Sequence, residues 1–164
     1  MINRVCWALI IVLLSASTGL AGPAEPNVVS GTGIAVIVNG ENPVDQLSLT
    51  ELQRIVLGER RSWNVRIPIV LMMRNEESRE RILVLQKACH MTDAEYHQYW
   101  TGKIFRGEVT SEPVALPSMG TALNFVSSIK GGISFVDAAR VRPGIKIMRI
   151  DGRLPGEQGY PLSD

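Results

Sequence analysis

The chain has 164 residues, and its 17 basic and 16 acidic residues leave a formal net charge of +1. Electrostatic binding to nucleic acid or to an anionic membrane surface needs a clear basic excess, so this balance argues against both partners. The length is sufficient for one domain with its own hydrophobic core.

Residues 1–22 have the pattern of a secretory signal peptide. Arg4 supplies the positive charge, residues 5–14 form an uncharged apolar stretch, and small residues follow it at the positions that a signal peptidase reads. A retained membrane anchor is the alternative, but the stretch is shorter than the ~20 residues that span a bilayer. We predict export to the periplasm, cleavage near residue 22, no stable membrane insertion afterwards, and a flexible lead-in at residues 23–33.

The two cysteines fall on either side of the predicted cleavage. Cys6 lies within the apolar stretch, so cleavage leaves Cys89 as the single cysteine, without a partner for an internal disulfide. Cys89 shares a helical pattern with apolar residues. This favours a buried thiol over a reactive one.

Apolar runs alternate with helical patterns along residues 34–164. The predicted strands are residues 34–38, 67–73, 113–116, 133–136 and 145–150, and the predicted helices are residues 48–58, 75–89, 92–107 and 118–129. Uninterrupted apolar strands are typical of parallel sheets covered on both faces. The order of elements therefore predicts a single α/β domain with a mostly parallel sheet flanked by helices.

Two of the predicted helices begin with a capping box, in which a hydroxyl residue is followed three positions later by a glutamate. These pairs are Ser48 with Glu51 and Thr92 with Glu95. Gly58 is expected to end the first helix in a left-handed conformation.

Apolar spacing predicts which helix residues enter the core. The stripe on helix 75–89 is Ile82, Leu85 and Cys89, and the following helix is expected to bury Trp100 and Phe105.

The transition from strand to helix at residues 70–78 carries the strongest functional signal. Arg74 ends the apolar run and Ser78 opens the helical pattern. Unpaired N–H groups and the helix dipole attract anions, and a nearby guanidinium completes a site for a tetrahedral oxyanion. Arg79 and Asn39 are further candidates, because ligands of open α/β sheets lie beyond the carboxyl ends of strands.

Each candidate also has a simpler structural role. Arg74 would form an ion pair with a neighbouring glutamate, and Ser78 would serve as the helix N-cap, a role compatible with ligand binding. Arg79 and Arg81 are most simply explained as a solvated helix face.

Carboxylates crowd this same region and argue against an anion. Glu76, Glu77 and Glu80 fall where a phosphate would lie.

Other chemistry has little support in the sequence. His90 and His97 lack a cysteine or carboxylate cluster at ligand spacing, so no metal site is predicted. No Ser/His/Asp or Cys/His arrangement is recognisable, and no cofactor or enzymatic activity is expected.

Six segments in chain order resemble the second half of the periplasmic phosphate-binding proteins of ABC transporters. They are residues 38–43 (Val-Asn-Gly-Glu-Asn-Pro), Leu57-Gly58 with Trp63, Arg74 with Ser78, Trp100 with residues 105–107 (Phe-Arg-Gly), residues 130–136 (Lys-Gly-Gly-Ile-Ser-Phe-Val) and Tyr160-Pro161-Leu162. The resemblance covers nearly all of the chain after the leader. It implies a type 2 periplasmic-binding-protein-like lobe, inorganic phosphate or a similar oxyanion as ligand, and an ABC permease or another periplasmic protein as partner.

The chain departs from the family pattern in two ways, and these departures lead to two hypotheses about its function. Arg79 and Glu80 stand where the family has Gly and Thr, and the chain has room for one lobe where the family closes two on the ligand. The first hypothesis is therefore an exported domain that binds a small oxyanion weakly or only with a partner. The alternative is an interaction protein that keeps the fold and has lost the ligand.

Overall fold

The structure, a computed structural model, describes residues 33–163. The predicted signal peptide at 1–22 and all of the lead-in except Gly33 lie outside the described residues. Within them, no helix is both long enough and apolar enough to cross a membrane.

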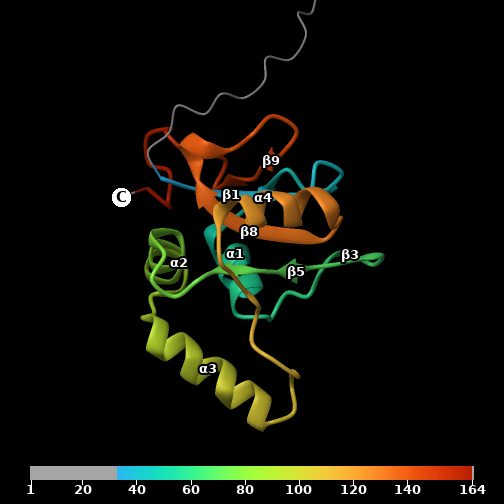
Figure 1. Ribbon diagram of the computed structural model, residues 1–164, viewed down its shortest axis with the longest axis vertical. Helices are drawn as coiled ribbons and strands as arrows, with labels where there is room; N and C mark the ends of the chain where they lie inside the picture. Colours follow the sequence, from blue (N-terminus) through green and yellow to red (C-terminus); the bar gives the residue numbers. More distant parts are fainter. Residues whose placement is uncertain (1–32, 164) are drawn as a thin grey trace, which may run out of the picture.

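A four-stranded sheet in the order β5-β8-β1-β9 forms the centre of the domain (Figure 1). Its strands are β1 (Ile34–Val38), β5 (Val70–Leu71), β8 (Gly132–Asp137) and β9 (Lys146–Ile147). Three two-stranded pairs surround it: β3 (Ser62–Asn64) with β4 (Ile67–Pro68), β6 (Met73–Arg74) with β7 (Ala115–Leu116), and β2 (Gln46–Leu47) with β10 (Arg149–Ile150).

Helices cover both faces of this sheet, which confirms the predicted α/β class. They are α1 (Leu49–Val56), α2 (Arg79–Val84) continued by a π-helical turn (Leu85–Cys89), α3 (Asp93–Phe105), α4 (Met119–Ser128) and a short 3₁₀ turn (Ala138–Arg140). Alternate residues of β1 enter two separate cores, because successive side chains of a strand point to opposite faces. Ile34 and Val36 pack with α1 and α2, whereas Ala35 and Ile37 pack with α4.

The direction of β1 differs from the mostly parallel sheet that we predicted. β1 is antiparallel to both of its neighbours, β8 and β9, and within the central sheet only β5 and β8 are parallel. An apolar run predicts that both faces of a strand are buried, but it does not predict the direction of the strand. The direction depends on which end of the sheet the preceding connection reaches. The central sheet is therefore mixed.

The local signals at helix ends are confirmed. Both predicted capping boxes form, and Gly58 has a φ of +67° at the end of α1. A Cβ there would lie 2.6 Å from the Trp100 ring, so close packing as well as conformation requires glycine.

Two of the expected core residues are exposed. Trp100, Leu85 and Cys89 are buried as predicted, but Phe105 is 93% exposed and Ile82 is 41% exposed. Phe105 is the last residue of α3, and α3 extends away from the sheet (Figure 1), so its tip has no facing layer to enter. Helical spacing alone does not show where a helix leaves the body of the domain.

Burial of Cys89 predicts an unreactive thiol. Desolvation raises the pKa of Cys89 to about 12, so almost no thiolate exists near neutral pH. In a Cys6→Ser chain, a water-soluble maleimide should label native protein far more slowly than urea-unfolded protein, as measured by mass spectrometry. Equal labelling rates would contradict the buried position.

Candidate functional site

The carboxyl ends of β6, β7 and β8 and the N-termini of α2 and α4 lie at one end of the sheet. β6 and β7 are parallel, with Arg74 beside Leu116, and the chain leaving β6 stays attached because Asn75 N donates to Leu116 O at 3.2 Å. α2 follows β6 and α4 follows β7. Arg79 reaches Asp137, the last residue of β8, at 3.5 Å. This arrangement gathers helix N-termini and strand carboxyl ends, as an oxyanion site requires.

Arg74 is more buried than the sequence suggested. Its residue is 9% exposed, and its Nη1 donates to Leu116 O at 2.8 Å. Its Nε is buried and has no hydrogen-bond partner among the described residues. Arg74 thus links β6 to β7. Within the described residues, it does not form the ion pair with Glu76 or Glu77 that we considered. Its guanidinium retains an unused donor.

Ser78 and Arg79 both have the structural roles that we considered. Ser78 Oγ accepts a hydrogen bond from Arg81 N at 3.2 Å, which makes it the N-cap of α2. Arg79 is about half exposed and forms its ion pair with Asp137 at the surface. Both side chains lie at the end of the sheet where Arg74 lies.

Asn39 lies at the opposite end of the sheet. β1 is antiparallel to β8, so Val38 pairs with Ile133 near the start of β8, far along the strand from Asp137. The Asn39 amide donates to Val126 O at 2.8 Å and its Oδ1 accepts from Glu41 N at 2.9 Å. The structure therefore does not place Asn39 with Arg74, because the sheet is not parallel at β1.

The start of α4 brings residues that we did not predict for this site. Ser118 caps α4 and its Oγ lies 2.8 Å from Thr121 Oγ1. Gly120 is in the same turn, and a Cβ there would meet nothing closer than Ser118 Oγ at 3.8 Å, so its backbone is open to approach. The sequence contains the signal, a serine followed by glycine and threonine at a helix start. The pairing of β6 with β7, which cannot be read from the sequence, brings the start of α4 beside Arg74. We call Arg74, Arg79, Ser118, Gly120 and Thr121 the strand-end site.

Carboxylates occupy the loop next to this site. Glu76 and Glu77, together with Asn75 and Ala115, line a shallow hollow of about 270 Å³. Two carboxylates disfavour an anion in that hollow. This hollow is therefore poorly suited to an anion, and the α4 side of the strand ends is better suited to one.

Arg81 is fully buried, contrary to the solvated face that we expected. It is 1% exposed, its Nε donates to Asp93 Oδ1 at 2.5 Å, and its Nη2 donates to Glu112 Oε1 at 3.3 Å. Its guanidinium also lies 5.3 Å from the Tyr96 ring centre. The sequence pattern predicts Arg81 on the exposed face of a helix. In the fold, two carboxylates from distant segments contact its guanidinium, which is therefore buried in the core.

His97 completes this group of charges. Its Nδ1 lies 2.7 Å from Glu112 Oε2, and its Nε2 lies 3.0 Å from Glu76 Oε1 and 3.4 Å from Asp93 Oδ2. Partial burial opposes the charged form, but the hydrogen bonds and charges of the three carboxylates outweigh it and raise the pKa of His97. We call Glu76, Arg81, Asp93, His97 and Glu112 the His97 cluster.

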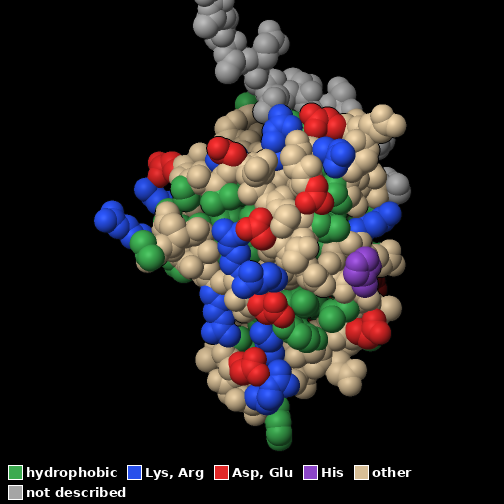
Figure 2. Space-filling view, turned by 180° about the vertical axis from the view of Figure 1, so that it is seen from behind, with side chains coloured by type: hydrophobic (Ala, Val, Ile, Leu, Met, Phe, Trp, Pro, Cys, Tyr) green, Lys and Arg blue, Asp and Glu red, His purple; other side chains and the backbone are tan. Residues whose placement is uncertain are grey.

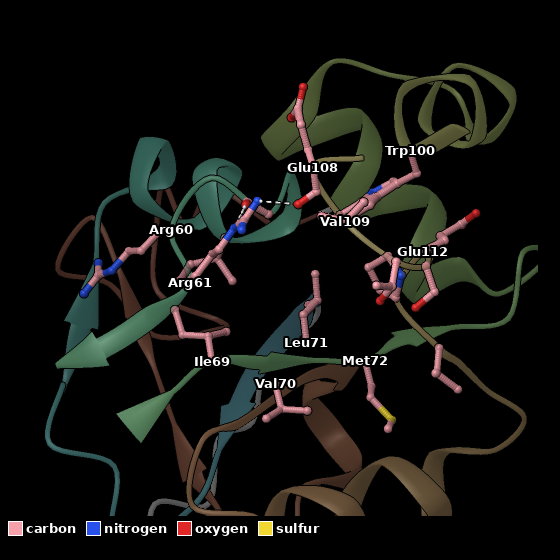
Figure 3. A pocket seen from close by; sticks show the side chains of 16 residues that line it. Arg60, Arg61, Ile69, Val70, Leu71, Met72, Trp100, Glu108, Val109 and Glu112 are labelled. Atoms are coloured by element: carbon pink, nitrogen blue, oxygen red, sulfur yellow. Dashed lines mark hydrogen bonds between the residues drawn. The ribbon is translucent and has the colours of Figure 1, made fainter. Parts of the chain in front are cut away.

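A mainly apolar groove of about 520 Å³ lies between β5 and the segment 108–114. Ile69, Leu71 and Met72 come from the strand region below it, and Trp100 comes from α3 above it (Figure 3). Arg61 crosses the groove, where its Nη2 donates to Glu108 O at 3.3 Å. The groove offers apolar area with charged residues at its margin.

Charges of both signs are mixed on the surface. On the face shown in Figure 2, basic side chains are interspersed with acidic ones, and neither sign forms a broad patch. That distribution agrees with the nearly balanced composition.

The fold of this chain is similar to that of solved proteins. This α/β domain shares the fold of about half of the chain in substrate-binding proteins of phosphate ABC transporters. Among the solved structures that match it are a phosphate ABC transporter substrate-binding protein with bound phosphate from Clostridium perfringens (21% identity, TM-score 0.61), an ABC-type phosphate transport receptor from Vibrio cholerae (18%, 0.63) and PstS from Borrelia burgdorferi (14%, 0.62).

The likeness covers most of this chain and about half of the others. The matches span 75%, 79% and 79% of this chain but 46%, 53% and 53% of those chains. No protein-family model and no curated protein sequence matches the chain. The predicted resemblance is confirmed at the level of fold, and the similar structures are named as transport receptors and binding proteins rather than enzymes.

Proposed function

We propose that this chain is an exported, periplasmic binding domain that holds a phosphate-like oxyanion at the strand-end site. The observation that carries the proposal is the start of α4 beside Arg74, where Ser118, Gly120 and Thr121 surround a helix N-terminus. The fold likeness supports it, since one of the similar structures holds phosphate.

The strand-end site offers three kinds of anion donor. The first turn of α4 has backbone N–H groups without helical partners, and Gly120 lets an oxyanion approach them. Ser118 and Thr121 add hydroxyls. Arg79 adds a half-exposed guanidinium that can share its charge between Asp137 and a ligand.

The same geometry limits affinity for the chain alone. The nearby Glu76 and Glu77 repel an anion, and the chain spans only about half the length of the similar structures, so it covers one side of the ligand. We expect a dissociation constant in the micromolar to millimolar range, about 4–8 kcal/mol of binding free energy. A partner that covers the open side, such as an ABC permease or another periplasmic protein, would strengthen binding.

Calorimetric titration with inorganic phosphate tests this function. Thr121→Val removes one donor and should weaken binding by roughly tenfold or more. Glu77→Gln removes a like charge and should tighten binding by up to about fivefold. Arg74→Ala is a poor probe because Arg74 is buried against Leu116 and its loss would also disturb β6 and β7.

Thr101→Val provides a matched control for Thr121→Val. Thr101 is an exposed threonine on α3, which extends away from the strand ends. Its replacement should leave phosphate binding unchanged. If neither the parent chain nor Glu77→Gln binds phosphate or sulfate, the oxyanion function is wrong.

The alternative function is an interaction protein without a ligand. Apolar exposure favours it: Phe105 at the tip of α3, Val65 in the β3–β4 turn and Val114 beside the groove all face solvent. Capture of a periplasmic partner that Phe105→Ser abolishes, together with no anion binding, would establish this alternative.

A further inference from the structure

Three separate segments bring metal-ligating atoms together in the His97 cluster. Glu76 comes from the loop after β6, Asp93 and His97 lie one turn apart at the start of α3, and Glu112 precedes β7. One oxygen of Glu76, one of Asp93 and one ring nitrogen of His97 all lie within 4.8 Å of one another.

The imidazole of His97 is oriented by its second nitrogen. Glu112 Oε2 lies 2.7 Å from Nδ1, so in the neutral ring the proton is assigned to Nδ1 and the lone pair to Nε2. A carboxylate on the far nitrogen of a histidine is the usual support for a metal-bound imidazole, because it sets the tautomer and increases the basicity of the ligand.

In that neutral form, three electron-rich atoms converge with no hydrogen atom between them, whereas in the protonated form Nε2 donates a hydrogen bond to Glu76. Nε2 lies 3.0 Å from Glu76 Oε1 and 3.4 Å from Asp93 Oδ2. Such an arrangement is repulsive unless a cation lies among the three atoms. A metal ion bound by the three atoms, or a proton on Nε2, would supply this positive charge.

Arg81 prepares the carboxylates for this role. It holds Asp93 by Oδ1 and Glu112 by Oε1, which leaves Oδ2 of the first and Oε2 of the second directed at His97. Because Arg81 is buried, these orientations are held by the core. Three carboxylates and one guanidinium give the cluster a charge of −2 when His97 is neutral, and a divalent cation neutralises that charge.

We propose that Glu76, Asp93 and His97 bind one divalent transition-metal ion, best matched by Zn²⁺, with Glu112 as the residue that positions His97. In tetrahedral coordination with bonds of ~2.0–2.1 Å, neighbouring ligand atoms lie about 3.3–3.4 Å apart. The distance of 3.4 Å between His97 Nε2 and Asp93 Oδ2 matches that separation. The distance of 3.0 Å between Nε2 and Glu76 Oε1 must lengthen slightly. Glu76 is on an exposed loop that can make this adjustment.

The ligand set selects the kind of metal. An imidazole nitrogen with two carboxylates suits Zn²⁺ and its first-row neighbours, whereas Ca²⁺ and Mg²⁺ prefer oxygen ligands alone. Three protein ligands leave a fourth position for water, and the three ligands are all partly exposed. The site is distinct from the strand-end site, which uses the start of α4.

Zinc titration by calorimetry tests this proposal. A Cys6→Ser chain, stripped with EDTA and kept in phosphate-free buffer, should bind one Zn²⁺ ion, and Ca²⁺ should not compete. His97→Gln should weaken zinc binding at least about tenfold, and Glu112→Gln should weaken it by about tenfold. His90→Asn is the matched control, since His90 is exposed, has a φ of +55° that asparagine tolerates, and lies outside the cluster.

Two results would overturn the zinc site. One is the absence of stoichiometric binding, which would leave the proton as the cation of the cluster. The other is equal binding by parent and His97→Gln. Imidazole resonances of the parent chain provide a second measurement that needs no variant: Zn²⁺ should shift those of His97 and leave those of His90 in place. Because phosphate is absent, these outcomes are independent of the oxyanion proposal.

Discussion

Replacing Arg81 with methionine is expected to lower the free energy of unfolding by about 3 kcal/mol. Methionine fills the space but leaves Asp93 Oδ1 and Glu112 Oε1, the two oxygens that face the guanidinium, without their cationic partner. Breaking a buried ion pair by removing one partner costs ~3–5 kcal/mol, and the lower end applies because both carboxylates retain some contact with water. Urea unfolding in EDTA measures this effect without any contribution from bound metal.

Arg79→Met is the matched control for this prediction. It removes the same group from the same helix, two positions earlier, where the side chain is half exposed and paired with Asp137 at the surface. Exposed pairs contribute about 1 kcal/mol or less, so the unfolding free energy should change little. If the two variants are equally stable, Arg81 does not have the buried structural role that its contacts indicate.

Gly131→Ala is expected to destabilise the domain by at least about 3 kcal/mol or to prevent folding. A Cβ at Gly131 would lie 1.9 Å from Pro68 O, and this is backbone that cannot move aside independently. The Gly131 carbonyl also accepts hydrogen bonds from Val70 N at 2.9 Å and from Trp63 Nε1 at 3.0 Å. Relief of the clash would therefore break the contact between β5 and the start of β8.

Gly102→Ala should have the opposite effect. Gly102 lies inside α3, and its added Cβ would meet only the flexible end of Arg106 at 3.2 Å. Alanine in a helix interior is favoured over glycine by ~0.8–1.0 kcal/mol, so the melting temperature should rise. A rise for both glycine variants would show that the Gly131 turn tolerates a side chain and that the close approach to Pro68 is wrong.

The α/β class, the helix caps and the resemblance to phosphate-binding proteins could all be inferred from sequence, because they depend on local spacing. Ser48 with Glu51 and Thr92 with Glu95 are each three residues apart, and a cap needs only that spacing and a helix. Arg74 and Ser78 are likewise joined by one short connection, and their joint role in an anion site stays a prediction.

Strand direction and charge partners were decided by the tertiary structure. An apolar strand such as β1 pairs equally well in either direction, so its antiparallel register, which separates Asn39 from Arg74, depends on the path of the whole chain. Asp93 lies 12 residues and Glu112 lies 31 residues after Arg81 in the sequence, and only folding brings the two carboxylates into contact with its guanidinium. The start of α4 joined the strand-end site through the pairing of β6 with β7, a long-range contact that no local pattern specifies.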